Sequence, residues 1–407
     1  MPEAVIVSVA RSPIGRARKG SLVDLRADDM TAQMVQAGLA QVPELDPRDI
    51  DDLMLGCGLP GGEQGFNLAR IVAVLAGMDH LPGTTVNRYC SSSLQTTRMA
   101  FHAIKAGEGE VFVSAGVEAV SRFAQGTSDW IPGAELENPR FAEATARTAK
   151  AAEGGTTWHD PREDGALPDA YISMGQTAEN VAQHTGVSRA EQDEFAQLSQ
   201  NRAEKAIAEG FFAREITPLA LPDGGTVDAD DSPRPGVTAE ALSGLDPVFR
   251  PDGTVTAGNA CPLTDGAAAL VIMSDAKARE LGLTPLARIV STGVSGLSPE
   301  IMGLGPVEAS RQALGRAGLS IDDVDLVEIN EAFAAQVIPS AKELGVPWEK
   351  LNVHGGAIAV GHPFGMTGAR ITATLLNGLR STDGQYGLET MCVGGGQGMA
   401  MVLERLS

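Results

Sequence analysis

The stretch TTVNRYCSSSLQTTRMAFHAI, from Thr84 to Ile104, decides both the fold and the chemistry of the chain. It begins with β-branched residues that suit a short buried strand, and Leu94, Phe101 and Ile104 then recur at helical spacing. We therefore predict a strand, a turn of small residues and a helix, with Cys90 at the helix N-terminus. Unpaired N–H groups and the helix dipole favour an anion there, so Cys90 is expected to ionise easily and to act as a nucleophile. The alternative for a single cysteine is an inert, buried residue.

Composition limits the other possibilities. A chain of 407 residues is too long for one hydrophobic core, so two or three domains are expected. The formal net charge of −21 argues against nucleic acid or an anionic membrane as a partner, because both require a basic surface. An anionic ligand would have to be met by local cations. We expect no signal peptide and no membrane span, since no apolar run approaches the ~20 residues that a span requires.

The cysteines indicate a reducing environment. The chain has four, Cys57, Cys90, Cys261 and Cys392, with neither a CxxC pair nor the spacing of a metal site. We therefore expect free thiols, no metal and a cytoplasmic location.

The order of predicted elements is duplicated. The first half is predicted to contain a strand at Ala4–Val9, a helix at Ala27–Ala40, an acidic turn with a strand in DIDDLM, the Cys90 segment, and a strand at Glu110–Gly116. The second half is predicted to contain a strand at Ala287–Ser291, a helix at Val307–Ala317, the acidic turn and strand of DDVDLVEI, a strand, turn and helix in NVHGGAIAVGHPFGMTGARITATLL, and strands at Leu388–Cys392 and Met399–Leu403.

This repetition predicts an α/β fold with two related domains and a mostly parallel sheet. The two turn-to-helix junctions would face each other across a pseudo-twofold axis. Cys90 and His362 would then be neighbours in space although they are far apart in the sequence.

An insertion separates the two halves. Residues 118–250 contain loops rich in Pro, Gly and Asp, and two helices, one from Met174 and one that starts at the capping box of Ser188 and runs to about Glu209. We interpret the insertion as a lid or ligand platform, with a purely structural elaboration as the alternative. The N-terminal domain is then predicted at residues 1–117 and 251–275, and the C-terminal domain at residues 276–407.

Three further polar groups stand beside turns. His362 lies in the glycine-rich GGAIAVGHPFG, Cys392 precedes the glycines of CVGGGQG, and Asn330 opens NEAFA. Taken singly, these motifs could be a structural histidine, a tight hairpin and a helix cap. Together with Cys90, at matching positions of a duplicated fold, they predict a catalytic site.

At these motifs the chain resembles the thiolase family. VNRYCSSSLQ, NEAFA, GGAIAVGHPFGMTGAR and CVGGGQG are similar to its four motifs, and MGQTAENVA and TVTAGNACPLTDGAAALVIMS also read as family segments. The resemblance implies the thiolase fold, in which two duplicated domains are layered α-β-α-β-α and a loop domain is inserted into the first. It also implies acyl transfer between coenzyme A thioesters.

The resemblance assigns a role to each motif residue. Cys90 matches the nucleophile that accepts the acyl group, and His362 the base that activates it and the incoming thiol. Cys392 matches the acid/base that exchanges a proton with the α-carbon of acetyl-CoA. Asn330 matches a residue that positions a water in one oxyanion hole, with His362 as the other donor. The N–H groups of Cys90 and Gly394 match the second hole.

The resemblance also implies binding residues and partners. Coenzyme A and acyl-CoA are expected as substrates, with no permanently bound cofactor and no metal. The residues expected near them are Arg234, Cys261, Ser173, Met174 and Phe333. A homodimer or homotetramer is expected, and a 3-hydroxyacyl-CoA dehydrogenase or hydratase partner is compatible with it.

Departures from the family pattern favour one direction of the reaction. Ser173 replaces a histidine that is common in acetoacetyl-specific members, and Cys261 replaces a common serine. These changes, with Phe364 and Met366, favour degradative cleavage of 3-ketoacyl-CoA over biosynthesis of acetoacetyl-CoA, which is the alternative. A ketosynthase-like condensing enzyme is less expected, because Cys392 occupies a position where those relatives use other residues. An inactive lipid-binding relative is also less expected, because all four polar site residues are retained.

Overall fold

The structure is a computed structural model, and it describes residues 2–123 and 137–407. Residues 124–136 of the predicted insertion lie outside the described residues. No helix within the described ranges combines the length and apolarity that a membrane crossing requires.

The main sheet is continuous, and its strands follow the order β10-β11-β12-β9-β1-β8-β5-β3-β4. In chain order, these strands are β1 (Ala4–Arg11), β3 (Asp52–Cys57), β4 (Gly83–Val86), β5 (Val111–Ala119), β8 (Thr264–Ser274), β9 (Ala287–Gly296), β10 (Leu326–Ile329), β11 (Tyr386–Val393) and β12 (Gln397–Arg405). The short strand β2 (Gly15–Arg16) pairs with β8, and β6 (Leu219–Ala220) pairs with β7 (Thr226–Val227) apart from this sheet.

The register of the strands repeats the duplication seen in the sequence. In the first half β3 and β5 are parallel, β5 and β8 antiparallel, and β8 and β1 antiparallel. In the second half β10 and β11, β11 and β12, and β12 and β9 repeat these relations in the same order. The halves meet where β1 pairs with β9, through Val5 with Arg288 and Ile6 with Ala287.

The prediction of a mostly parallel sheet is wrong. Only the β3/β4, β3/β5 and β10/β11 ladders of the described sheet are parallel. The physical reason is clearest at β11 and β12, because the three residues between them are too few for a crossover and allow only an antiparallel hairpin. The strand predicted at the start of NVHGG is also wrong, since residues 352–356 form no strand and Leu351, just before them, makes only an isolated bridge to Val327.

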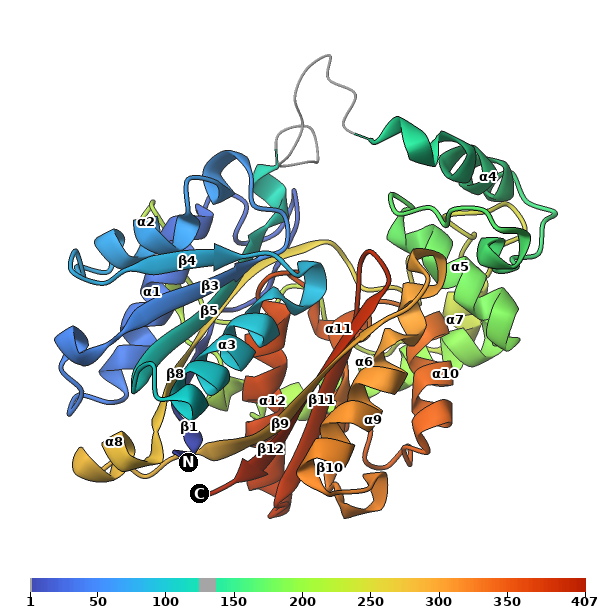
Figure 1. Cartoon of the computed structure of the whole chain (residues 1–407). Helices are drawn as coiled ribbons and strands as arrows, with labels where there is room; N and C mark the ends of the chain where they lie inside the picture. The colour runs from blue at the N-terminus through green and yellow to red at the C-terminus, as the bar shows by residue number, and fades with distance from the viewer. Residues whose placement is uncertain (1, 124–136) are drawn as a thin grey trace.

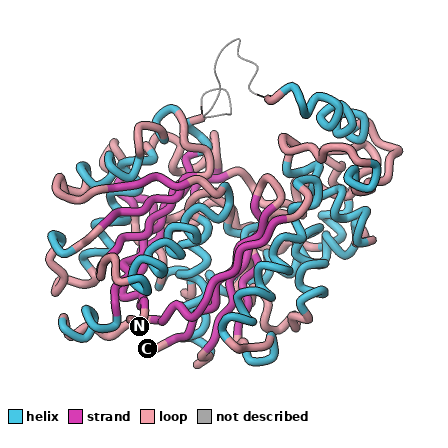
Figure 2. Tube along the Cα trace, in the orientation of Figure 1, coloured by secondary structure: helices cyan, strands magenta, loops and turns pink. Residues whose placement is uncertain are grey.

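Helices divide the molecule into five layers (Figure 1). α3 (Ser92–Ala106) and α12 (Thr367–Thr382) pack against each other between the two halves of the sheet. α1 (Ala27–Ala40) and α2 (Leu68–Leu75) cover the outer face of the first half, and α9 (Gly305–Ala317) with α10 (Ala334–Leu344) covers that of the second. Figure 2 shows the strands of both halves with helices between and outside them. The short helices α8 (Asp275–Glu280) and α11 (Ala357–Val360) lie in the connections.

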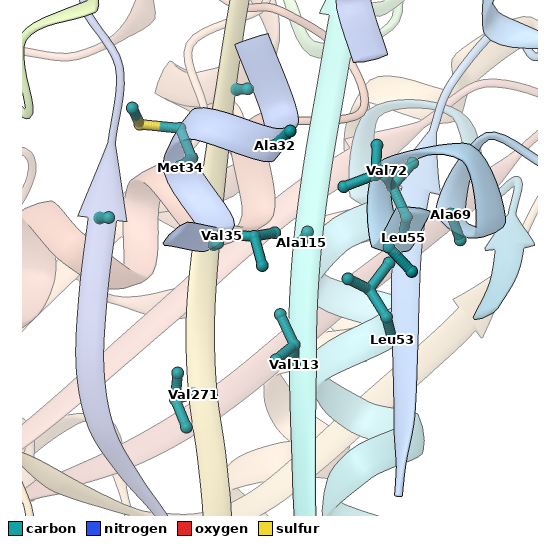
Figure 3. Packing of buried hydrophobic residues seen from close by; sticks show 14 of the residues in the cluster. Ala32, Met34, Val35, Leu53, Leu55, Ala69, Val72, Val113, Ala115 and Val271 are labelled. Atoms are coloured by element: carbon teal, nitrogen blue, oxygen red, sulfur yellow. The ribbon is translucent and has the colours of Figure 1, made fainter. Parts of the chain in front are cut away.

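Apolar spacing explains why α1 forms where it was predicted. Met30 and Met34 lie one turn apart on the face that is buried against the sheet. Figure 3 shows the same packing from close by, with Val35 of α1 beside Ala115 of β5 and Val72 of α2 beside Leu55 of β3. Fully burying a side chain of this size stabilises the fold by about 1.5–3 kcal/mol.

The insertion carries α4 (Ala142–Ala152), α5 (Met174–Thr185), α6 (Arg189–Ala208) and α7 (Ala239–Ser243). α6 begins with the predicted capping box, in which the Glu191 carboxylate accepts the Ser188 N–H at 2.8 Å. The buried Arg11 of β1 binds Glu215 at 2.9 Å and Asp230 at 2.6 Å. These two ion pairs attach the insertion to the first half of the sheet, because a buried guanidinium must keep its partners.

Candidate active site

Cys90 lies in a strained turn at the start of α3, the nucleophile turn (residues 87–91). Tyr89 has φ of +43°, which is an uncommon and costly conformation for an aromatic residue. Its N–H donates to Asn87 Oδ1 at 2.8 Å, and its carbonyl accepts from Ser92 Oγ at 2.7 Å. These hydrogen bonds hold the strained conformation and place the buried Cys90 at the helix N-terminus.

His362 lies in the turn before α12, the histidine turn (residues 361–366). Its Nδ1 is 2.6 Å from Thr367 Oγ1, and that hydroxyl donates to the carbonyl of Pro363 at 2.7 Å. Since the hydroxyl has one proton to donate, we assign the proton of the ring to Nδ1. Nε2 is then free to accept a proton. The backbone N–H of His362 donates to Thr264 Oγ1 at 3.0 Å, which fixes the turn.

Asn330 directly follows β10 and faces the imidazole. Its Nδ2 is 3.3 Å from His362 Nε2, and its own N–H donates to the carbonyl of Thr390 at 2.9 Å. Its Oδ1 is buried without a protein partner. A buried polar atom of this kind, beside an imidazole, suits the binding of a polar group of a ligand or an ordered water.

The hairpin between β11 and β12 carries the second cysteine. Cys392 is fully buried near the end of β11, and Gly395 and Gly396 turn the chain with φ of +78° and +81°. The N–H of Gly394 donates toward the sulfur of Cys90. This hairpin therefore brings one sulfur and one backbone donor to the nucleophile.

Direct contacts join the helices that follow the nucleophile and histidine turns, and the nucleophile turn to the hairpin. At the start of α12, the Ala369 N–H donates to Ser93 Oγ in the first turn of α3 at 2.9 Å. The side chain of Arg88 donates to Gln397 Oε1 at 2.8 Å, which connects the nucleophile turn with the hairpin. The two helix junctions thus face each other, and the four motifs converge on one site.

Burial dominates the protonation of the site. It raises the pKa of Cys90 to about 12, against the N–H groups of Gly394 and Cys90, which lower it. Burial also lowers the pKa of His362 to about 3, and the charge of Arg370 acts in the same direction. Both groups are therefore neutral at pH 7. This raised pKa opposes the sequence-based prediction of a resting Cys90 thiolate, because loss of hydration outweighs the helix N-terminus.

An apolar wall surrounds the sulfur atoms. Phe333 and Cys392 belong to one buried cluster, and Met174 packs against it. The Met174 sulfur also lies close to Gly394. Ser173 is exposed at the N-cap of α5, immediately before this wall. Chemically, the arrangement offers a thiol, a neutral base and backbone donors in an environment that excludes water.

Cys261 and Arg234 lie on the side of the insertion. The Cys261 N–H donates to the carbonyl of Ala332 at 3.0 Å, inside the NEAFA segment. A groove next to it is lined by residues that include Arg16, Ser232, Arg234 and Ala260. The exposed Arg234 and the unpartnered buried hydroxyl of Ser232 give this groove a cationic, hydrogen-bonding end.

Sequence reasoning missed three residues of the site. Thr367 and Thr264 orient His362, and the buried Glu118 accepts the N–H of Gly365 in the histidine turn. Thr367 could have been found, because it lies five residues after His362 within the same motif. Glu118 gave no signal beyond a carboxylate at the end of an apolar strand.

Comparison with known proteins identifies the family that the chain matches. Residues 4–276 match the thiolase N-terminal domain and residues 283–405 the thiolase C-terminal domain. A 3-ketoacyl-CoA thiolase of Bacillus subtilis (strain 168) is 43% identical over 417 residues, which cover 99% of this chain and 100% of that relative. The structure of Bacillus anthracis acetyl-CoA acetyltransferase superimposes with a TM-score of 0.86 at 39% identity, covering 100% of this chain and 99% of the other. The structure of human mitochondrial 3-ketoacyl-CoA thiolase superimposes with a TM-score of 0.84 at 37% identity, with the same coverage of both chains.

The neutral resting state predicts an unusual pH dependence of alkylation. Labelling of Cys90 by iodoacetamide should still be accelerating at pH 10, because a thiol with a pKa of about 12 continues to gain thiolate up to that pH. Timed mass spectrometry of the labelled peptide measures this. In the denatured chain, as the control, the rate should level off above the ordinary thiol pKa of about 8.5. A plateau below pH 8 in the native enzyme would restore the resting thiolate.

Proposed function

The chain belongs to the thiolase family, and we propose that it cleaves 3-ketoacyl-CoA with coenzyme A through an acyl-enzyme on Cys90. The products are acetyl-CoA and an acyl-CoA shortened by two carbons. The chain is an acyltransferase, as its family requires. The observation that carries the assignment of Cys90 is the Gly394 N–H directed at its sulfur, in a site that also holds the neutral base His362.

Attack on the ketone begins with a proton transfer. The Cys90 thiol gives its proton to Nε2 of His362 while its sulfur attacks C3 of the substrate. The C3 oxygen becomes an anion beside the sulfur, where the N–H groups of Cys90 and Gly394 can stabilise it. Removing one donor of such a hole costs roughly 2.7–4 kcal/mol in other acyl-transfer enzymes. Because Cys90 and His362 are both neutral at rest, the proton transfer creates charge only after the substrate has bound.

Carbon–carbon cleavage follows from collapse of this intermediate. The C3–O bond regains double-bond character, the C2–C3 bond breaks, and its electrons form the enolate of acetyl-CoA. Asn330 and the protonated His362 are placed to stabilise the enolate oxygen. The Cys392 thiol then donates a proton to C2. The proton on His362 then passes to the Cys392 thiolate, so that both groups are neutral again. In the second half, His362 removes the thiol proton of coenzyme A, whose sulfur attacks the acyl group on Cys90. The shortened acyl-CoA leaves, and the Cys90 sulfur regains its proton from His362.

The substrates need local positive charge in an acidic protein. Coenzyme A carries phosphates, and the groove with Arg16 and Arg234 supplies two guanidinium groups beside Cys261. We assign this groove to the phosphorylated end of coenzyme A. The buried Ser232 hydroxyl is available to the same ligand. Coenzyme A enters and leaves as a substrate in every turnover, so no permanently bound cofactor is part of the proposal.

Direction and chain length form a finer part of the proposal. Ser173 provides little bulk at the entrance to the apolar wall of Met174 and Phe333, which favours acyl chains longer than acetoacetyl and degradative cleavage. Biosynthesis of acetoacetyl-CoA is the alternative, and one structural relative is an acetyl-CoA acetyltransferase of Bacillus anthracis. A cytoplasmic location is also proposed, since Cys90, Cys261 and Cys392 carry unoxidised thiols. A dehydrogenase or hydratase partner would supply the 3-ketoacyl substrate.

An exposed apolar face supports a homo-oligomer. Strand β4 ends the described sheet with one unpaired edge, and large apolar side chains beside it are exposed: Phe66 (90%), Ile71, Val74 (47%), Leu75 and Tyr89. Such an edge invites pairing with a second copy. We propose a twofold contact across β4 and α2, with the same face used by both subunits.

Acyl chain length tests the degradative assignment. Because Ser173 leaves room beside the apolar wall, 3-ketohexanoyl-CoA and 3-ketooctanoyl-CoA should be cleaved with kcat/KM at least equal to that of acetoacetyl-CoA. The loss of 3-ketoacyl absorbance measures each rate. A strong preference for acetoacetyl-CoA would instead favour the biosynthetic alternative.

Mutation of Cys392 separates the two half-reactions. In Cys392→Ala, carbon–carbon cleavage and uptake of deuterium from water into acetyl-CoA should fall by roughly 10²–10⁴, the range for losing a general acid–base. Acyl exchange between coenzyme A molecules should persist, because it forms and breaks only C–S bonds at Cys90.

The matched control is Cys90→Ala, which should abolish acyl exchange. A buried packing role for Cys392 predicts instead that both half-reactions fall in proportion. Labelled coenzyme A and deuterium uptake, measured on the same folded protein, distinguish these results.

Charge on the exposed face tests the oligomer. Val74→Asp should dissociate the oligomer, because it buries a carboxylate in the proposed contact. Ile207→Asp is the matched control, since Ile207 is also a helical residue that is 49% exposed, but it lies on α6 of the insertion. Sedimentation velocity gives the masses. Equal masses for both variants and the wild type would place the contact elsewhere.

A further inference from the structure

One buried carboxylate receives N–H groups from both sides of the active site. Glu118, near the end of β5, has 0% of its surface exposed. Its Oε2 accepts the N–H of Gly58 at 2.8 Å and that of Gly365 at 2.9 Å. Its Oε1 accepts the side-chain amide of Gln64 at 2.8 Å and the N–H of Leu59 at 3.3 Å. The loop after β3 and the histidine turn are therefore bonded to the same group.

The nucleophile turn reaches the same point. A Cβ atom placed on Gly58 would lie 2.7 Å from Glu118 Oε2, 2.9 Å from Phe364 Cβ and 3.4 Å from the carbonyl oxygen of Tyr89. Phe364 belongs to the histidine turn, and its ring packs edge-on against His362. The carboxylate and an atom of each turn thus lie within 3.4 Å of one point, the position of a Cβ atom on Gly58.

Gly365 depends on this carboxylate. A Cβ atom on Gly365 would lie 2.2 Å from the carbonyl oxygen of Val117 and 2.7 Å from that of Gly56. The backbone of the histidine turn is therefore pressed directly onto the ends of β3 and β5, away from water. A buried N–H group requires an acceptor, and here Glu118 is the acceptor.

The hydrogen-bond donors that surround the side chain of residue 118 explain why it is a glutamate. Among the described residues, the hydrogen-bonding partners of Glu118 are uncharged N–H groups and the thiol of Cys57. A carboxylate offers about four lone-pair sites on two oxygens, as these N–H donors require. Burial raises the pKa of Glu118, and the N–H groups of Gln64, Gly365, Gly58 and Leu59 oppose that rise. Aspartate would be one methylene too short to reach both the loop after β3 and the histidine turn.

We propose that Glu118 is a positioning residue of the thiolase reaction, which bonds the histidine turn to the loop after β3, beside the nucleophile turn, so that His362 can take the proton of Cys90. The proposal rests on the proposed function. Glu118 acts through the backbone of Gly365, and its own carboxylate takes no proton in the reaction.

Two substitutions at one position test the geometry. Glu118→Asp should lower kcat for thiolysis at pH 7 by about 10²-fold, the cost of a misplacement of roughly 1 Å. Glu118→Gln should lower kcat by a smaller factor, because its one amide oxygen can still accept the N–H groups of both Gly58 and Gly365. KM for coenzyme A should stay near the wild-type value, since the Arg234 groove is unchanged. In Glu118→Asp, alkylation of Cys90 at pH 10 should also keep the wild-type rate, because the variant retains the negative charge that adds to burial in raising the Cys90 pKa, and hydroxide removes the thiol proton without His362.

Glu179→Gln is the matched control. Glu179 is also buried and accepts uncharged N–H groups, from Thr254 at 2.9 Å and Val255 at 2.9 Å, but it lies in α5 of the insertion. The Glu179→Gln substitution should lower the melting temperature of the protein and leave kcat at the wild-type value. The proposal is overturned if folded Glu118→Asp keeps wild-type kcat, or if kcat and alkylation at pH 10 fall in parallel, as a general loss of structure requires. Where one Glu118 variant does not fold, the other decides.

Failure of the proposed function is a separate result. If the wild-type protein does not cleave 3-ketoacyl-CoA, that proposal is wrong whatever the variants do. The ratio of Cys90 alkylation rates at pH 7 and pH 10 still tests Glu118 in that case. The ratio should fall in Glu118→Asp, because only the reaction at pH 7 uses His362 as the base, and an unchanged ratio overturns the positioning role.

Discussion

The hydrogen bond from the Ala369 N–H to Ser93 Oγ, at 2.9 Å, joins the first turns of α12 and α3, and the geometry of the site depends on it. The two helices approach so closely there that a Cβ atom on Gly368 would lie 2.3 Å from the backbone nitrogen of Leu94. Each helix leads directly from a turn that carries a reactive side chain. Because a helix is rigid over its first turns, joining the two N-termini also sets the relative position of the nucleophile and histidine turns.

Such close packing excludes water from the site, and the exclusion of water determines the protonation states of Cys90 and His362. Burial drives the pKa of Cys90 up and that of His362 down, so neither group is charged before a substrate arrives. The same low local dielectric strengthens the hydrogen bonds of the Gly394 N–H and of Asn330 once an oxyanion forms. Charge therefore forms in the site only when the groups that stabilise it are in contact with the substrate, and no thiolate is held beforehand.

Local signals in the sequence predicted several elements closely. The apolar spacing of Ala27–Ala40 gave a helix with the bounds that α1 has, and the Ser188 capping box marked the start of α6. These features depend on residues within a few positions of each other. The arrangement of strands did not follow from such signals, since a parallel sheet was expected where β11 and β12 form a tight antiparallel hairpin. That outcome depends on the three-residue link between the strands, which the alternation of elements does not reveal.

The sequence by itself determined the family, the duplicated order of elements and the four polar residues Cys90, Asn330, His362 and Cys392, because each of them lies in a motif of contiguous residues. The tertiary structure alone decided the protonation states and the role of Glu118. Protonation depends on the water excluded by segments that are distant in the chain. The partners of Glu118 lie as far away as Gly365, 247 positions along the chain, and no local pattern records such a contact.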